Sequence, residues 1–213
     1  MRYGCWVPGI ASALRSASPR CGPSRLVCVD GPAGSGKTSL AAELAAELGD
    51  APVVHLDDLY EGWSQPLGQP LAARVEAWLL LPWSVGLPGR HLRFDWGRDR
   101  FTSWVEVPAA PLLVLEGCGS GSAGIREYAS AVVWVDAPAE ECLRRGLARD
   151  GAALASRWRA WQEQEAAHFA RDRTRAAATT IVNHQRTGGR GPGDEPVMTP
   201  QSTHPTGPGG IMP

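Results

Sequence analysis

The octapeptide GPAGSGKT at residues 31–38 constrains the fold of this chain more than any other feature of its sequence. It follows the apolar run LVCV at residues 26–29 and opens an alanine- and leucine-rich stretch at residues 37–48. This order predicts a buried strand, a tight loop and a helix. In a G-x-x-x-x-G-K-[ST] loop the glycines let backbone N–H groups converge on phosphate oxygens, and the helix adds the positive end of its dipole. The sequence therefore predicts a phosphate-binding loop.

Lys37 is the single lysine of a chain that carries twenty arginines. On a solvated surface the two residue types serve equally well, but a tight backbone cradle accepts only the compact ammonium group. We expect Lys37 to reach the β- and γ-phosphates of ATP and the Thr38 hydroxyl to bind Mg²⁺. The other positions expected to bind the nucleotide are Gly31, Gly34, Ser35, Gly36 and Ser39.

Further apolar runs favour strands at residues 52–56, 112–115, 131–135 and 179–182. Helical patterns separate these runs, around residues 71–79, 138–150 and 152–175. Buried strands that alternate with helices predict an α/β fold, the three-layer α/β/α P-loop NTPase fold with a parallel sheet of roughly five strands. Residues 82–108 are rich in Trp and Arg without such a pattern, and we expect an irregular insertion that faces the substrate.

We expect one domain over residues 25–184, with segments of lower order on either side. Residues 1–24, rich in Pro, Ser, Gly and Arg, are interpreted as a weakly ordered lead-in with at most a short helix. In residues 185–213, thirteen of twenty-nine positions are Gly or Pro, which predicts a disordered tail because such a composition cannot build a packed core.

The net charge and the cysteine pattern indicate which binding partners and which cellular compartment to expect. The formal net charge is −1, so no basic excess favours a nucleic acid or an anionic membrane surface. The five cysteines form no C-x-x-C pair, which is typical of reduced thiols and favours the cytoplasm. No apolar run approaches the roughly 18 residues that a membrane span needs.

Carboxylates stand at the ends of three of the expected strands: Asp30, the pair Asp57 and Asp58, and Glu116. The C-terminal ends of parallel strands share one edge of the sheet, which is where ligands bind. Asp57 or Asp58 could take the proton of an acceptor hydroxyl as a general base, and Glu116 could hold Mg²⁺ through water. The alternative for each is an ordinary loop carboxylate or a helix cap.

Arginines and tryptophans supply the remaining candidates. Arg144, Arg145 and Arg149 fall on one expected helix, where they could neutralise charge that builds up during phosphoryl transfer, or could pair with Glu140 and Glu141 as a solvated face. Trp158 and Trp161 are expected in the core, and His55 and His168 in structural roles. One or two of four tryptophans expected in loops could stack on a planar substrate; these are Trp63, Trp83, Trp96 and Trp104.

Together with the phosphate loop, four segments resemble the uridine kinase and phosphoribulokinase branch of P-loop kinases: DDLY at residues 57–60, FDW at 94–96, EG at 116–117 and RRGLARD at 144–150. The resemblance covers about residues 25–183. It implies that Asp57 is the catalytic base and that Glu116 helps to organise the metal. It also implies that Tyr60 lies by the substrate and that Arg145 and Arg149 belong to a mobile lid. Asp58 and Asp95 complete the residues expected at the acceptor.

The resemblance implies transfer of the γ-phosphate of ATP to a hydroxyl of a small molecule, most readily a nucleoside. Two departures bear on the acceptor: Leu59 stands where Phe is usual, and the family's His-Pro-Asp stretch is not recognisable. They motivate an alternative, a nucleotide-binding regulatory or accessory ATPase that transfers nothing. The hypothesis that the chain is a GTPase has less support still, because no N-K-x-D segment is present.

Overall fold

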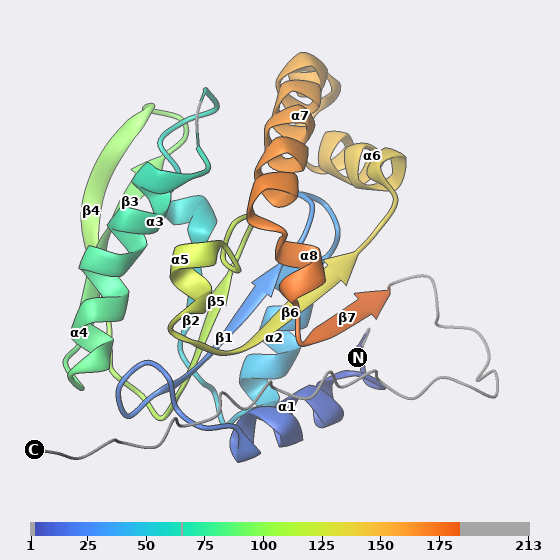
Figure 1. Cartoon of the computed structure of the whole chain (residues 1–213). Helices are drawn as coiled ribbons and strands as arrows, with labels where there is room; N and C mark the ends of the chain where they lie inside the picture. The colour runs from blue at the N-terminus through green and yellow to red at the C-terminus, as the bar shows by residue number, and fades with distance from the viewer. Residues whose placement is uncertain (1–2, 65, 184–213) are drawn as a thin grey trace, which may run out of the picture.

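A parallel five-stranded sheet forms the centre of the computed structural model, which describes residues 3–64 and 66–183 (Figure 1). The order across the sheet is β2-β5-β1-β6-β7, so the strand that precedes the phosphate loop lies in the middle. The five strands are β1 (Arg25–Asp30), β2 (Val53–His55), β5 (Leu112–Glu116), β6 (Ala129–Asp136) and β7 (Thr180–Asn183). All of their pairings are parallel, as the sequence predicted.

Both faces of the sheet are covered, because the central strands are apolar on both sides. Leu26 and Cys28 of β1 pack into one hydrophobic cluster, and Val27 and Val29 pack into another. On the second face lie α1 (Val7–Ser16) and α2 (Lys37–Glu47). On the first face lie α3 (Gln69–Val75), η2 (Glu76–Leu80), α4 (Leu81–Ser84), α5 (Ala123–Arg126) and α7 (Ala155–Asp172). The three-layer α/β/α fold is thereby confirmed.

The lead-in at residues 1–24 is not the weakly ordered segment that its composition suggested. From residue 3 onward it is packed on the domain, and α1 buries Val7, Ile10 and Leu14 against α2 and the sheet. Apolar residues at this spacing lie on one face of the helix, and this face packs on the apolar side of the sheet. The Pro- and Gly-rich composition hid a ten-residue helix because Pro8 falls in its first turn, where proline is tolerated.

Residues 82–108 are not irregular either. Strands β3 (Gly89–Asp95) and β4 (Arg100–Val107) pair as an antiparallel hairpin beside the main sheet (Figure 1). The preceding helical segment runs through α3, η2 and α4, so it continues to Ser84, beyond the helical pattern expected around residues 71–79. Aromatic rings join the hairpin to this segment, because Trp78 packs edge-to-face on Phe101 and Trp104.

After β6 come two helices that extend over the carboxyl edge of the sheet. These are α6 (Ala139–Asp150) and α7, joined by η3 (Ala152–Leu154) and followed by α8 (Thr174–Ala177). Strand β7 confirms the predicted fifth strand. Residue 184 and the predicted tail at residues 185–213 lie outside the described residues. Among the described helices, none is long and apolar enough to cross a membrane.

Candidate functional site

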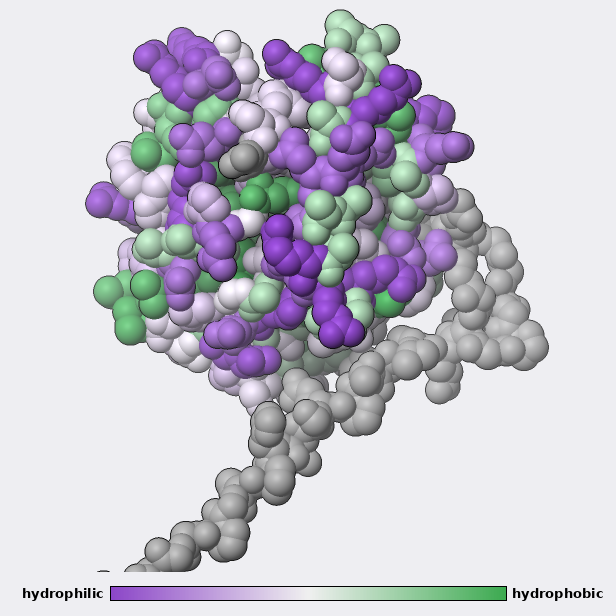
Figure 2. All heavy atoms as spheres, turned by 45° about the horizontal axis from the view of Figure 1, so that its top comes forward, coloured by the Kyte–Doolittle hydropathy of each residue, from purple (hydrophilic) through white to green (hydrophobic). Residues whose placement is uncertain are grey.

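A cavity of about 730 Å³ opens at the carboxyl edge of the sheet. The phosphate loop, the residues after β2, the turn of the β3–β4 hairpin, α6 and α7 line it. Seen from above the sheet edge, it is a hollow with a hydrophobic floor and a largely hydrophilic rim (Figure 2). This is the edge where an open α/β sheet binds ligands.

The phosphate loop is packed so closely that three of its positions, Gly31, Gly34 and Gly36, leave no room for a side chain. Gly34 and Gly36 have φ angles of 82° and 105°, in the region that side chains rarely adopt. A Cβ on Gly34 would lie 2.4 Å from the backbone oxygen of Cys142, and one on Gly36 would lie 2.4 Å from the hydroxyl of Tyr3. The glycines of the motif therefore serve both the curvature of the loop and its packing against α6 and the N-terminal segment.

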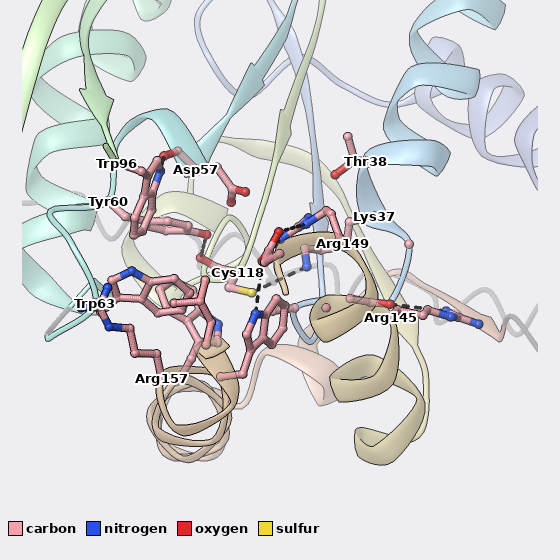
Figure 3. A pocket seen from close by; sticks show the side chains of 18 of the residues that line it. Lys37, Thr38, Asp57, Tyr60, Trp63, Trp96, Cys118, Arg145, Arg149 and Arg157 are labelled. Atoms are coloured by element: carbon pink, nitrogen blue, oxygen red, sulfur yellow. Dashed lines mark hydrogen bonds and ion pairs between the residues drawn. The ribbon is translucent and has the colours of Figure 1, made fainter. Parts of the chain in front are cut away.

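Lys37 is buried and its ammonium group turns back onto its own loop. Its Nζ donates a hydrogen bond to the backbone oxygen of Pro32 at 2.9 Å and lies 3.6 Å from Sγ of Cys118. Burial alone would lower the pKa of Lys37, but the surrounding acidic groups, Cys118 and Glu116 foremost, raise it above its ordinary value. The amine is therefore held as a cation beside the phosphate loop, and Lys37 lines the cavity (Figure 3).

Thr38 and Glu116 form the candidate metal position. The Thr38 hydroxyl lies 3.2 Å from Oε1 of Glu116, whose side chain is almost fully buried at the end of β5. A hydroxyl and a carboxylate are hard oxygen ligands, and Mg²⁺ in proteins takes few of these while it keeps water and phosphate oxygens. The two residues fit Mg²⁺ on this ground.

His55 holds that carboxylate from the other side. Its Nδ1 contacts the same Oε1 of Glu116, and this hydrogen bond is the main reason that the pKa of His55 is raised. His55 was expected to have a structural role, and in the structure it holds Glu116, a residue of the candidate metal position. No local sequence pattern predicts this contact, because residues 55 and 116 meet through the pairing of β2 with β5.

Asp57 and Asp58 could not be told apart from the sequence, but their side chains have different surroundings in the structure. Asp57 lines the cavity, and within the described residues no side chain donates a hydrogen bond to its carboxylate. Its pKa is raised, first because protein surrounds it and then because Glu116 is near; Lys37 and Arg149 oppose this shift. Asp58 turns away from the cavity and pairs with Arg93 at 3.1 Å. Of the two aspartates, only Asp57 lines the cavity.

Arg145 and Arg149 line the cavity, and both also pair with acidic side chains. Arg145 pairs with Glu141 at 2.8 Å and reaches the backbone oxygen of Gly34 at 3.4 Å. Arg149 pairs with Asp150 at 2.7 Å. Arg144 pairs with Glu141 and does not line the cavity. All three arginines are therefore paired with carboxylates of their own helix, and two of them, Arg145 and Arg149, also line the cavity.

Aromatic side chains form the wall opposite the phosphate loop (Figure 3). Trp63 packs edge-to-face on Trp96 and on Trp161, with ring centroids 5.4 Å and 5.8 Å apart. Tyr60 packs against Trp161 at 5.1 Å and donates its hydroxyl to the backbone oxygen of Cys118 at 2.9 Å. Of the tryptophans expected in loops, Trp63 and Trp96 reach the cavity, whereas Trp83 is buried in the core and Trp104 lies on the hairpin surface.

Two of the candidate carboxylates lie elsewhere. Asp95 accepts hydrogen bonds from the backbone N–H groups of Gly97 and Arg98, so it caps the hairpin turn and does not line the cavity. Asp30 is fully buried and accepts the backbone N–H groups of Gly31, Gly119 and Gly121. It fixes the phosphate loop to the segment after β5.

Glu165 of α7 is a buried carboxylate that the sequence analysis missed. Its Oε2 accepts the backbone N–H of Ala33 in the phosphate loop at 2.9 Å and the indole N–H of Trp161 at 3.0 Å. The signal was present, because Glu165 falls four residues after Trp161 and three before His168, on the buried face of the helix. An acidic residue on such a face needs a partner, and the partner is the loop.

Comparison with known proteins agrees at the level of the fold. No protein-family model matches the sequence, and no curated protein matches it. Among solved structures, a possible uridine kinase from Bacillus stearothermophilus superposes with a TM-score of 0.63 at 16% identity, over 85% of this chain and 100% of that one. A protein from Silicibacter sp. TM1040, proposed to be a fructose transport system kinase, superposes with a TM-score of 0.51 at 21% identity, over 84% of this chain and 95% of that one. The chain therefore shares the α/β/α fold of these two structures.

Proposed function

We propose that this protein is an ATP-dependent phosphotransferase that moves the γ-phosphate to a hydroxyl group of a small molecule. The observation that carries the proposal is that Asp57 presents a carboxylate in the same cavity as Lys37 and Thr38, and that no residue in the described part of the chain donates a hydrogen bond to it. A phosphate-binding loop alone would serve any nucleotide-binding protein. A free carboxylate across from it supplies the base that an acceptor hydroxyl requires.

The donor half of the reaction belongs to the phosphate loop. The backbone N–H groups of residues 31–39 and the start of α2 would hold the phosphates, and Lys37 would leave Pro32 to contact the β- and γ-phosphates. Arg145 already reaches the carbonyls of Gly34 and Ser35, so a modest rearrangement would bring its guanidinium onto the transferred group. Arg149 lines the same cavity and would add a second positive charge.

Mg²⁺ would be held by the Thr38 hydroxyl and, directly or through water, by Glu116, and it would neutralise charge on the β- and γ-phosphates. The chain's own residues do the rest. Asp57 would accept the proton of the acceptor hydroxyl, and Lys37 and Arg149 would keep that carboxylate ionised by opposing the effect of its surroundings. The helices α6 and α7 would limit the access of water, which would otherwise consume ATP.

The aromatic wall favours an acceptor with a planar group. Trp63, Trp96 and Trp161 offer ring faces or edges within the cavity, and such rings bind flat molecules by stacking. A nucleoside combines a planar base with sugar hydroxyls, so it is the acceptor that we propose first. The likeness in fold to a possible uridine kinase supports this choice.

One observation favours a second candidate, a nucleotide-binding accessory protein without phosphotransfer. Arg145 and Arg149 are each engaged with a carboxylate of their own helix, as in a solvated helix face. If these pairs persist when nucleotide is bound, neither of these two arginines would be free to neutralise the transferred group.

The test is Mg²⁺-dependent ADP production from ATP, with and without uridine, cytidine and a panel of sugars and sugar phosphates, beside a Lys37→Ala control. Stimulation by one acceptor that is absent from the control would support the kinase and name its substrate. Nucleotide binding with no stimulation by any acceptor would favour the accessory protein.

A further inference from the structure

Glu165 joins the two halves of the cavity through a single oxygen atom. Three donors converge on its Oε2: the Ala33 backbone N–H at 2.9 Å, the Trp161 indole N–H at 3.0 Å and the Cys118 thiol at 3.4 Å. Ala33 belongs to the phosphate loop, and the Trp161 ring belongs to the aromatic wall. The two residues are separated by more than a hundred positions in the sequence, and this carboxylate is the shared partner of both.

The surroundings of Glu165 make this junction stiff. The side chain is 4% exposed, so its hydrogen bonds are shielded from water and are costly to leave unmade. Lys37 lies close enough for its charge to stabilise the carboxylate, whose pKa burial would otherwise raise further. If the Ala33 amide of the phosphate loop moves, Oε2 of Glu165 therefore has to move with it, or the buried hydrogen bond between them breaks.

The Trp161 ring, in turn, sets the shape of the acceptor side. It packs edge-to-face on Tyr60 and on Trp63, at 5.1 Å and 5.8 Å between ring centroids. Its indole N–H has no other hydrogen-bond acceptor among the residues described, so Glu165 fixes the rotation of the ring. A shift of Glu165 is passed on to the surface on which an acceptor would stack.

We propose that Glu165 is a positioning residue that couples occupancy of the phosphate loop to the position of Trp161 in the acceptor wall. The inference rests on the proposed function, because it takes residues 31–38 as the nucleotide site. It goes further in that it makes the acceptor surface depend on bound nucleotide. Glu165 itself touches neither the nucleotide nor the acceptor in this proposal.

The experiment follows the Trp161 ring when nucleotide binds, in the full chain labelled with 5-fluorotryptophan. The Trp161 fluorine resonance is assigned by its loss in Trp161→Phe, and Mg·ADP is titrated while its affinity is measured by calorimetry. In the wild type we expect ADP to shift the Trp161 resonance. In Glu165→Ala we expect ADP still to bind, but about tenfold more weakly, because the Ala33 N–H is left unpaired. We also expect that ADP no longer shifts the Trp161 resonance in this variant.

Two further variants separate positioning from a general effect on folding. Glu165→Gln should keep the shift, because the amide oxygen can accept the same two N–H groups. Glu163→Ala, on the exposed side of the same helix, should behave as the wild type. If Glu165→Ala does not fold, Glu165→Asp takes its place, since a carboxylate one methylene shorter cannot reach both donors and should lose the shift.

The outcomes distinguish this inference from the proposed function. ADP binding to the wild type without a shift of Trp161, or a shift of equal size in the Ala or Asp variant, would overturn the coupling and leave the nucleotide site intact. Failure of the wild type to bind ADP at all would overturn both.

Discussion

Asp58 and Arg93 form an ion pair, with 3.1 Å between Oδ2 and Nε, that turns the Asp58 carboxylate away from the cavity. Its neighbour Asp57 is left to face the cavity without a hydrogen-bond donor in the described part of the chain. Two adjacent aspartates thus differ in role because η1 (Leu56–Asp58) points their side chains in different directions. This difference provides a matched pair of variants.

Asp57→Asn should lower phosphotransfer by about a hundredfold to ten-thousandfold, the usual contribution of a general base, while ATP affinity stays within a few-fold of the wild type. Asp58→Asn should retain most of the activity because it removes only a partly exposed ion pair. Turnover and ATP affinity are measured on both variants with the acceptor found in the panel. Equal losses in both, or full activity in Asp57→Asn, would contradict the assignment of the base.

Lys37 should be irreplaceable by arginine. The ammonium group is buried and fits between the Pro32 carbonyl and Cys118, and a planar guanidinium has no room there. We expect Lys37→Ala and Lys37→Arg each to raise the dissociation constant for Mg·ATP by about tenfold to a hundredfold, as the loss of a charged hydrogen bond does. Calorimetry provides the measurement. An Arg variant that binds ATP like the wild type would show that the loop is roomier than this packing implies.

Asp30 should make the protein less stable as the pH rises from about 4 to about 6. Burial raises the pKa of Asp30 to about 6, above the ordinary value of 3.8, although three backbone N–H groups and Lys37 oppose the shift. Between these two values the folded state binds more protons than the unfolded state, so the free energy of unfolding falls as the pH rises. A rise of about two units corresponds to at most about 3 kcal/mol.

The measurement is the free energy of unfolding in urea at several pH values, for the wild type and for Asp30→Asn. The variant should lose this contribution to the slope and should be less stable at pH 4 by about 1–3 kcal/mol, since one of the three N–H groups loses its acceptor. Asp50→Asn, at an exposed position, serves as the control and should keep the wild-type slope. Identical slopes in all three proteins would show that Asp30 ionises as in the unfolded chain.

The sequence predicted the sheet and the phosphate loop well because their signals are local. A continuous apolar run such as residues 26–29, followed by the octapeptide at residues 31–38, leaves one arrangement of strand, loop and helix. The roles of Asp57 and Asp58 could not be separated in this way. Their difference depends on Arg93, which the hairpin brings close and which no local pattern reveals.

The elements that were predicted wrongly from the sequence depend on tertiary contacts. The β3–β4 hairpin holds together through aromatic packing, such as Trp78 on Phe101, that has no short-range signature. Glu165 acquires its importance from Ala33, which is 132 positions away. The N-terminal helix has weak helical propensity, and the uncovered face of the sheet supplies the driving force that orders it.

The stability of α1 itself can be tested at Gly9. Gly9 lies inside this helix, is exposed, and would have nothing within 4 Å of an added Cβ. Because alanine loses less backbone entropy than glycine on entering a helix, Gly9→Ala should raise the free energy of unfolding by about 0.5–1 kcal/mol. Gly49→Ala is the matched control. That position is equally open but has a φ of 80°, so alanine there should lower the free energy by about 1–2 kcal/mol. Urea unfolding measures both, and no gain in Gly9→Ala would mean that the N-terminal segment is not a stable helix in solution.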